Sequence, residues 1–275
     1  MSDGRPIGVF DSGVGGLTVA RAILDLLPQE PILYVGDNAR FPYGPKPVEE
    51  IRRYALEVAD YLVNRDVKMI VVACNSVEVS AIGDIAVRAG IPVVGVIDPG
   101  VRAAAHATRN GVVGMIGTVA TVASGAYDRA MARASIGVTL HSQACPVFVE
   151  HVERGDMTSH ELQSAAHRYL SPLVANGIDT LILGCTHYPL LSGLLQLELG
   201  PQVVLVSSAE ETAKDVYATL LREELQVADP SPPSHEFLAT GDPEQFQRVA
   251  EVFWGHELPQ VRATRALPVG GGSWS

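Results

Sequence analysis

Two cysteines follow two short apolar segments that echo each other. Cys74 comes directly after residues 69–73, and Cys185 comes directly after residues 181–184. Segments of this length and apolarity are typical of strands buried on both faces of a parallel sheet. Open α/β sheets bind their ligands outside the carboxyl ends of the strands. We therefore expect the two thiols to face one pocket from opposite sides.

A helix is expected to begin after each of these cysteines. The backbone N–H groups and the dipole at a helix N-terminus favour a thiolate and bind anions. An isolated free cysteine is more often a small buried hydrophobic residue. The paired placement of Cys74 and Cys185 favours a chemical role for both. Cys145, before Pro146, is instead expected to be a packed thiol near a helix start.

Three polar residues could exchange protons with these thiols. Asp11 follows the first expected strand and could orient or deprotonate a thiol at the next strand end, although it could also be only a helix N-cap. His187, two residues after Cys185, could tune that thiol and protonate a bound group. Glu153 lies on the helix that follows Cys145 and could face the pocket, whereas an exposed carboxylate is the ordinary expectation.

Metal and cofactor sites are not expected. Cys74, Cys185 and His187 could be zinc ligands, but the spacing lacks a C-x-x-C pair. The glycine-rich loop at residues 11–16 fits neither the dinucleotide nor the P-loop pattern, and the carboxylate at its mouth would repel phosphate. The chain has three lysines, none in a phosphate-cradling context, which argues against pyridoxal phosphate.

The composition limits the class of protein. The 275 residues are 47% hydrophobic and 19% charged, as in a globular protein. The net charge of −11 without a basic stripe argues against direct nucleic-acid binding. Apolar runs fall short of the roughly 18 residues that a membrane span requires, and the first residues do not form a signal peptide. We expect a cytoplasmic protein with reduced thiols and no membrane contact.

Strands and helices alternate along most of the chain. Expected strands are residues 7–10, 32–35, 69–73, 93–96, 112–116, 138–141, 181–183 and 203–206. Expected helices are residues 48–64, 100–108, 159–176 and 210–224, followed by a late strand at 236–240 and a helix at 243–254. This alternation predicts an α/β fold with parallel sheets and right-handed crossovers.

A second pair of segments has an offset similar to that of the cysteine pair, 113 − 7 = 106 residues against 185 − 74 = 111. Residues 7–12 and 113–118 each join an apolar strand to a small hydroxyl residue. We therefore expect two pseudo-symmetric lobes, each a mostly parallel sheet flanked by helices, with the active site in the cleft between them. The turn residues Asp98-Pro99-Gly100 suggest a boundary. The expected lobes are residues 1–98 with 207–265, and residues 99–206; a linker occupies 228–234 and a loose tail 266–275.

Six motifs occur in order between residues 6 and 265. They are Gly8-Val-Phe-Asp11-Ser12-Gly13-Val-Gly15-Gly16-Leu-Thr18, Asp37-Asn-Ala-Arg-Phe-Pro42-Tyr43-Gly44, Ala73-Cys74-Asn75-Ser76, Gly117-Thr118-Val-Ala-Thr121, Ala144-Cys145-Pro146 and Gly184-Cys185-Thr186-His187-Tyr188-Pro189. In these motifs the chain resembles the cofactor-independent aspartate/glutamate racemase family, and glutamate racemases in particular. Ser76-Val77 departs from the usual Thr-Ala, which we expect to alter pocket packing without loss of activity.

The resemblance implies interconversion of L- and D-glutamate by a two-base mechanism without metal or pyridoxal phosphate. One cysteine thiolate removes the α-proton, and the other thiol delivers a proton to the opposite face. Asp11 is then expected to assist Cys74, and His187 and Glu153 to assist Cys185. The expected substrate-binding residues are Asp11, Ser12, Pro42, Tyr43, Gly44, Asn75, Ser76, Thr118, Thr121, Thr186 and His187.

The resemblance carries further expectations. D-Glutamate would supply bacterial peptidoglycan synthesis, the protein would be a homodimer, and Cys74 would act on the D-enantiomer while Cys185 acts on the L-enantiomer. An aspartate racemase is the nearest alternative, and an additional role as a DNA gyrase-binding inhibitor is an alternative from another class. Because few residues precede the first strand, we expect activity without an activator.

Overall fold

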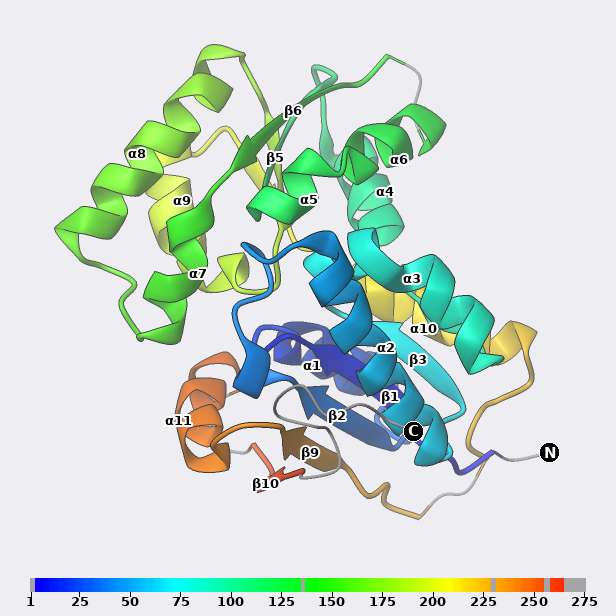
Figure 1. Cartoon of the computed structure of the whole chain (residues 1–275). Helices are drawn as coiled ribbons and strands as arrows, with labels where there is room; N and C mark the ends of the chain where they lie inside the picture. Colours follow the sequence, from blue (N-terminus) through cyan, green and yellow to red (C-terminus); the bar gives the residue numbers. More distant parts are fainter. Residues whose placement is uncertain (1–2, 135–136, 229–230, 255–257, 265–275) are drawn as a thin grey trace.

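The computed structural model describes residues 3–134, 137–228, 231–254 and 258–264, and within these ranges the strands form two separate sheets. The first sheet has the order β10-β9-β2-β1-β3-β4 and the second has the order β6-β5-β7-β8. Every paired strand runs parallel to its neighbour. The α/β fold with two lobes is confirmed, one lobe in the lower half of Figure 1 and the other in the upper half.

The strands and helices have the following bounds. The strands are β1 (Ile7–Asp11), β2 (Ile32–Gly36), β3 (Met69–Val72), β4 (Val93–Val94), β5 (Val112–Gly117), β6 (Thr139–Ala144), β7 (Thr180–Gly184), β8 (Val204–Val206), β9 (Glu236–Ala239) and β10 (Val261–Ala263). The α-helices are α1 (Leu17–Leu26), α2 (Val48–Asn64), α3 (Asn75–Ala89), α4 (Ile97–Ala107), α5 (Val119–Ala123), α6 (Ala126–Ala134), α7 (Pro146–Glu153), α8 (His160–Ala175), α9 (Ser192–Leu199), α10 (Ala209–Arg222) and α11 (Pro243–Trp254). Short 3₁₀ helices occupy η1 (Asn38–Arg40) and η2 (Tyr188–Leu191).

The two sheets share one strand order. In the first lobe β1 lies between β2 and β3, with β4 outside β3; in the second, β5 lies between β6 and β7, with β8 outside β7. Strands β9 and β10 are an addition beside β2. The two cysteines therefore follow equivalent strands, β3 and β7, and the two echoes in the sequence mark equivalent positions of a duplicated unit.

Helices cover both faces of each sheet because the strands are apolar on both sides. In the first lobe α1, α10 and α11 pack on one face, and α2 and α3 pack on the other. In the second lobe α4 and α6 cover one face, and α7, α8 and α9 cover the other. Helix α2 shows the reason locally, since its buried residues Ile51, Ala55, Val58, Ala59 and Leu62 form one stripe at helical spacing.

Asp98-Pro99-Gly100, the turn-forming residues that suggested the boundary, lie in the first turn of α4 and not in a loop. Proline is tolerated in a first helical turn, where its missing N–H would have had no partner. The Gly100 amide continues the helix by donating to the carbonyl of Val96 at 3.2 Å. Turn-forming residues therefore mark the start of a helix at this position.

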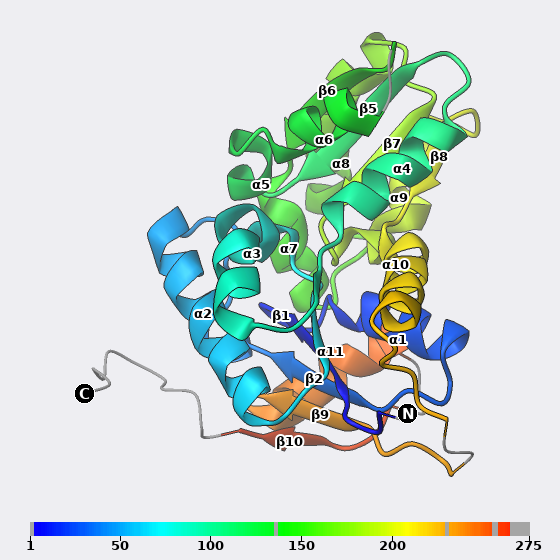
Figure 2. The same ribbon diagram turned by 90° about the vertical axis from the view of Figure 1, so that its right-hand side faces the viewer.

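The lobe bounds of residues 1–98 with 207–265 and of residues 99–206 stay a prediction. The chain crosses between the two sheets twice, from β4 into α4 and from β8 into α10, as Figure 2 shows. The expected tail at 266–275 and part of the expected linker at 228–234 lie outside the described residues. Within the described ranges, no helix has the length and apolarity to cross a membrane.

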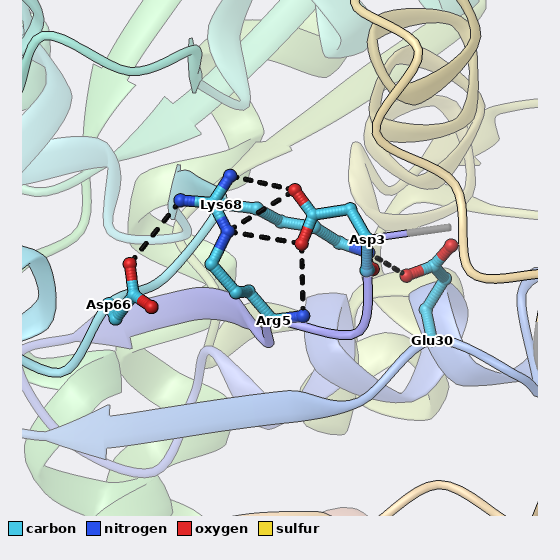
Figure 3. Close-up of polar contacts among 5 residues, drawn as sticks. All are labelled: Asp3, Arg5, Glu30, Asp66 and Lys68. Carbon is cyan, nitrogen blue, oxygen red and sulfur yellow. Dashed lines mark hydrogen bonds and ion pairs between the residues drawn. The ribbon is translucent and has the colours of Figure 1, made fainter. Parts of the chain in front are cut away.

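A buried ion pair ties several segments together at the amino-terminal ends of the first sheet's strands. Lys68 Nζ donates to Glu30 Oε2 at 2.5 Å and to the Asp3 carbonyl at 2.8 Å (Figure 3). The other oxygen of Glu30 accepts from the Val227 amide at 3.0 Å. The Lys68 side chain is fully buried and that of Glu30 is 6% exposed. The pair thus joins the starts of β1, β2 and β3 to the chain that follows α10.

Lys68→Met is expected to lower the free energy of unfolding by about 3–5 kcal/mol, because Glu30 is left as a buried charge without its partner. Urea denaturation measures the loss. The exposed pair between Arg5 and Asp66 supplies the control, and Asp66→Asn is expected to cost less than about 1 kcal/mol. A second Glu30→Gln change should recover much of the loss. Equal losses of unfolding free energy in Lys68→Met and Asp66→Asn would show that the buried Lys68–Glu30 pair stabilises the fold no more than an exposed pair does.

Candidate active site

One cavity between the lobes contains both cysteines. It opens where the carboxyl ends of the central strands of the two sheets face each other. The predicted residues that line it are Ser12, Pro42, Tyr43, Gly44, Cys74, Asn75, Ser76, Thr118, Cys185, Thr186 and His187. Asp11, Thr121 and Glu153 are buried or half-buried residues behind this lining. The two thiols thus lie where the strand ends predicted them.

Cys74 is the N-cap residue of α3, as its position after β3 predicted. Its thiol donates to the hydroxyl of Ser12 at 3.6 Å. Burial and the negative charge of Asp11 raise the pKa of the Cys74 thiol well above its usual range, and a hydrogen bond from the Val77 amide opposes them only in part. In the free protein at neutral pH, Cys74 is therefore protonated.

Asp11 is fully buried at the end of β1. Its Oδ2 accepts from the amides of Gly16 at 3.0 Å and Gly13 at 3.3 Å. Its Oδ1 has no hydrogen-bond partner among the described residues. Asp11 is therefore not the N-cap residue of α1, which is Gly16, but a carboxylate that accepts from the glycine-rich loop and has an acceptor oxygen still available.

Cys185 has a different partner. Its sulfur lies 3.8 Å from Nδ1 of His187, whose Nε2 lies 2.6 Å from Oε1 of Glu153. Burial by itself lowers the pKa of His187, but the hydrogen bonds to Cys185 and Glu153 outweigh burial and raise that pKa to about 10. His187 is thus an imidazolium at neutral pH. Glu153, at the end of α7, reaches Cys185 only through this ring.

The expected α-helix directly after Cys185 is wrong. Residues Tyr188–Leu191 form a 3₁₀ turn, and α9 begins only at Ser192. Pro189, inside that turn, cannot donate an amide to a regular helix. The loop that carries Thr186 instead packs on the glycine-rich loop of the first lobe: a Cβ on Gly15 would lie 2.4 Å from Thr186 Oγ1. Gly15 is therefore required for the two loops to meet.

The first turn of α3 is bonded to the second lobe beside the cavity. Ser76 Oγ lies 3.0 Å from Thr118 Oγ1, and the Tyr127 hydroxyl donates to Asn75 Oδ1 at 2.7 Å. Thr121 lies 3.0 Å from Thr118 through its own hydroxyl. Thr121 therefore contacts the site through Thr118. The helix that begins at Cys74 is thus held by both lobes.

Tyr43 reaches the cavity from the segment after η1. Its hydroxyl donates to Asp37, which also accepts from Arg40 Nε at 2.6 Å and from Thr240 Oγ1 at 2.7 Å. Because this hydroxyl is occupied in the interior, Tyr43 offers the cavity its ring and backbone. The polar cluster around Asp37 holds the segment that includes Pro42 and Gly44.

Several lining residues were not found by sequence reasoning. They are Phe41, Pro45, Val119, Pro146, Val149 and Glu150. Most are apolar or proline and carry no chemical signal, although Phe41, Val119 and Pro146 lie within the motifs and Pro45 directly follows one. Within the described residues, no group of three or more His, Cys, Asp or Glu side chains is arranged to hold a metal ion.

Comparisons with known proteins agree with this geometry. A model of the Asp/Glu/hydantoin racemase family matches residues 7–216. The glutamate racemase of Acidothermus cellulolyticus is 56% identical over 257 residues, which cover 93% of this chain and 97% of that protein. The crystal structure of a glutamate racemase isoform from Bacillus anthracis superposes with a TM-score of 0.89 at 41% identity, covering 94% of this chain and 97% of that one.

A second solved structure has the same fold. The glutamate racemase of Francisella tularensis, crystallised in complex with D-glutamate, has a TM-score of 0.89 at 35% identity and covers 96% of this chain and 98% of its own. The match extends over both lobes in each comparison. The chain therefore belongs to the Asp/Glu/hydantoin racemase family and, within it, to the glutamate racemases, which are amino-acid isomerases.

Proposed function

We propose that this chain interconverts L- and D-glutamate by two-base proton transfer at Cα, with Cys74 and Cys185 on opposite faces of the substrate. The observation that carries the proposal is that two thiols on equivalent loops line one cavity, each beside a different proton-handling group. Racemisation requires a proton to leave one face of Cα and another to reach the opposite face. A pair of groups from two related lobes suits that requirement.

The protonation states give the order of events in the L-to-D direction. The imidazolium of His187 can hydrogen-bond a Cys185 thiolate, which takes the α-proton from L-glutamate. The Cys74 thiol, kept protonated by burial, then gives its proton to the other face of the planar carbanion. The chain is left with a Cys185 thiol and a Cys74 thiolate. Release of the first proton through His187, and uptake of another beside Asp11, restores the starting state.

Removal of an α-proton beside a carboxylate places more negative charge on an anionic group, so preorganised donors must stabilise the carbanion. We assign this role to Asn75, Ser76 and Thr186 and to the amides at the start of α3. Ser12, Pro42, Tyr43, Gly44, Thr118 and Thr121 are proposed to hold the ammonium and carboxylate groups, Tyr43 by its backbone and Thr121 through Thr118. Phe41, Val119 and Val149 add apolar side chains to the lining, and we propose that they limit the access of water to the reacting carbon.

Incubation of the purified chain with L-glutamate in D₂O tests the proposal. D-Glutamate should form with deuterium at Cα, as measured by chiral chromatography and mass spectrometry. D-Glutamate that retains the original α-hydrogen would contradict two-base transfer. L-Aspartate serves as the parallel substrate, and turnover of aspartate without glutamate would replace the proposed substrate by aspartate.

The wider roles are proposed on the family relationship. D-Glutamate made in the cytoplasm would supply peptidoglycan synthesis, and depletion of the protein should be rescued by external D-glutamate. The homodimer is tested by analytical ultracentrifugation. Inhibition of DNA gyrase is tested by a supercoiling assay with a Cys74→Ser variant: inhibition by this variant would support a binding role separate from racemisation.

A further inference from the structure

Glu78 joins the helix that carries Cys74 to the first crossing between the lobes. Its Oε2 accepts from the amides of Val96 at 2.5 Å and Ile97 at 3.1 Å. These amides lie at the N-terminus of α4, where backbone donors have no partner inside the helix. A carboxylate there also complements the positive end of the helix dipole. Glu78 is therefore a cap that α3 supplies to α4.

The segment between β4 and α4 leaves space for the Glu78 carboxylate at Gly95. A Cβ on Gly95 would lie 2.4 Å from the carboxyl carbon of Glu78, so only glycine lets the two approach. The second crossing meets α4 at a similar point, because a Cβ on Gly100 would lie 3.2 Å from Cβ of Ser208. Figure 2 shows both crossings between the lobes. The carboxylate thus occupies the place where the lobes are connected.

The same stretch of α3 reaches the active site. The Glu78 amide donates to the Cys74 carbonyl at 2.9 Å. On the next residues, Asn75 and Ser76 bond to Tyr127 and Thr118 of the second lobe. The start of α3 therefore carries the Cys74 thiol, two hydrogen bonds to the second lobe and the carboxylate that caps α4. A change at Glu78 would act on the separation of the lobes at the cavity.

We propose that Glu78 is a positioning residue for racemisation: by capping α4 from α3 it holds the lobes at the spacing that places Cys74 opposite Cys185. This inference rests on the proposed two-cysteine function. Glu78 does not line the cavity that contains the thiols, so its action is indirect.

The surroundings of Glu78 make the cap dependent on pH. Glu78 is half-buried, and its partial removal from water raises the pKa of its carboxyl to about 7, against the two amide hydrogen bonds that favour the ionised form. The charged and titratable groups around it are Asp98 and Arg102 on α4, Asp215 and Arg222 on α10, and Tyr127 on α6. Asp98 further favours the neutral form. Arg102 is paired with Asp215 at 2.6 Å, and Glu78 forms no ion pair among the described residues.

The sign of the dependence follows from proton linkage. The pKa of Glu78 in the capped state lies above that of an exposed carboxyl, so the capped state binds this proton more tightly than the uncapped state does. The cap is therefore favoured below about pH 7 and loses stability as the pH rises through that value. Misaligned lobes reduce the fraction of protein that is competent to bind substrate, and KM rises by that factor.

Two substitutions separate the cap from the charge. Glu78→Ala is expected to raise KM for glutamate about tenfold at pH 6, with kcat within about threefold of the unchanged chain. Glu78→Gln keeps an acceptor oxygen for both amides and should have nearly unchanged KM at pH 6. The unchanged chain should show KM rising between pH 6 and pH 8, and the Gln variant should lose that part of the profile. Asp98→Asn removes an equal charge from the same cavity wall. Its KM should not change at pH 6, where Glu78 is mostly neutral, and its expected effect is only on the pH at which KM begins to rise.

Amide hydrogen exchange tests the role of Glu78 as a cap independently of enzyme activity. Hydrogen exchange of the Val96 and Ile97 amides, followed by NMR, should be at least tenfold faster in Glu78→Ala than in the Asp98→Asn control. Unchanged exchange or an unchanged KM in the alanine variant would overturn the inference. If that variant does not fold, the pH profile of Glu78→Gln decides: a KM profile equal to that of the unchanged chain would overturn it. Inactivity of the unchanged chain would instead refute the proposed function, and the exchange result would still stand.

Discussion

Replacing either Cys74 or Cys185 by serine is expected to lower kcat/KM for both enantiomers of glutamate by about 10³-fold or more. A serine hydroxyl is a much weaker acid than a thiol, so it cannot act as the thiolate base at neutral pH. Because each turnover uses both positions, loss of one interrupts racemisation in both directions. Chiral chromatography of the products measures the loss. Near-normal turnover by either variant would contradict the two-base assignment.

The single-thiol variants should also show which thiol serves which enantiomer. In Cys185→Ser, Cys74 can still remove the α-proton of D-glutamate and return a solvent proton to the same face. We expect deuterium to enter D-glutamate but not L-glutamate in D₂O, and the reverse in Cys74→Ser. Cys145→Ser is the matched control: this third thiol is also buried, donates to the Gln143 carbonyl and lies outside the cavity lining. Racemisation by that variant should remain within severalfold of the unchanged chain.

Asp11→Asn and His187→Asn are expected to lower turnover by about 10²-fold or more, each by impairing one thiol. Asp11 has an acceptor oxygen with no partner among the described residues, and its negative charge raises the pKa of the Cys74 thiol. His187 instead hydrogen-bonds Cys185. The effects should therefore differ in kind. Asp11→Asn should slow removal of the proton from D-glutamate, and His187→Asn should slow removal of the proton from L-glutamate.

The difference between Asp11→Asn and His187→Asn cannot appear in a comparison of kcat/KM for the two enantiomers. L- and D-glutamate have equal free energy in solution, so the two directions must have equal kcat/KM in every variant. It should appear in the primary deuterium isotope effect measured with glutamate labelled at Cα. Asp11→Asn should raise the effect for labelled D-glutamate and lower it for labelled L-glutamate, and His187→Asn should do the reverse. The same pattern of isotope effects in both variants would contradict separate partners for the two thiols.

The sequence alone determined the fold class and the positions of the two thiols at strand ends. Strands β1, β3, β5 and β7 are so apolar that they must be buried on both faces, and this requires parallel sheets covered by helices. In such sheets the carboxyl ends of the strands carry the site. Cys74 and Cys185 could therefore be placed at one cleft before any coordinates were known. Asp11, His187 and Glu153 could be named from their positions as candidates for proton exchange, and the motif resemblance assigned each of them to one thiol.

Tertiary structure alone decided which groups act directly and which act through others. The sequence does not reveal that the Tyr43 hydroxyl donates to Asp37, that Thr121 reaches the cavity through Thr118, or that Val149 and Glu150 line it. The start of α4 at Ile97, through turn-forming residues, depends on a carboxylate from another helix. Local sequence encodes which side chains of each helix or strand are buried and their spacing along it, whereas these contacts depend on how the two sheets are set against each other.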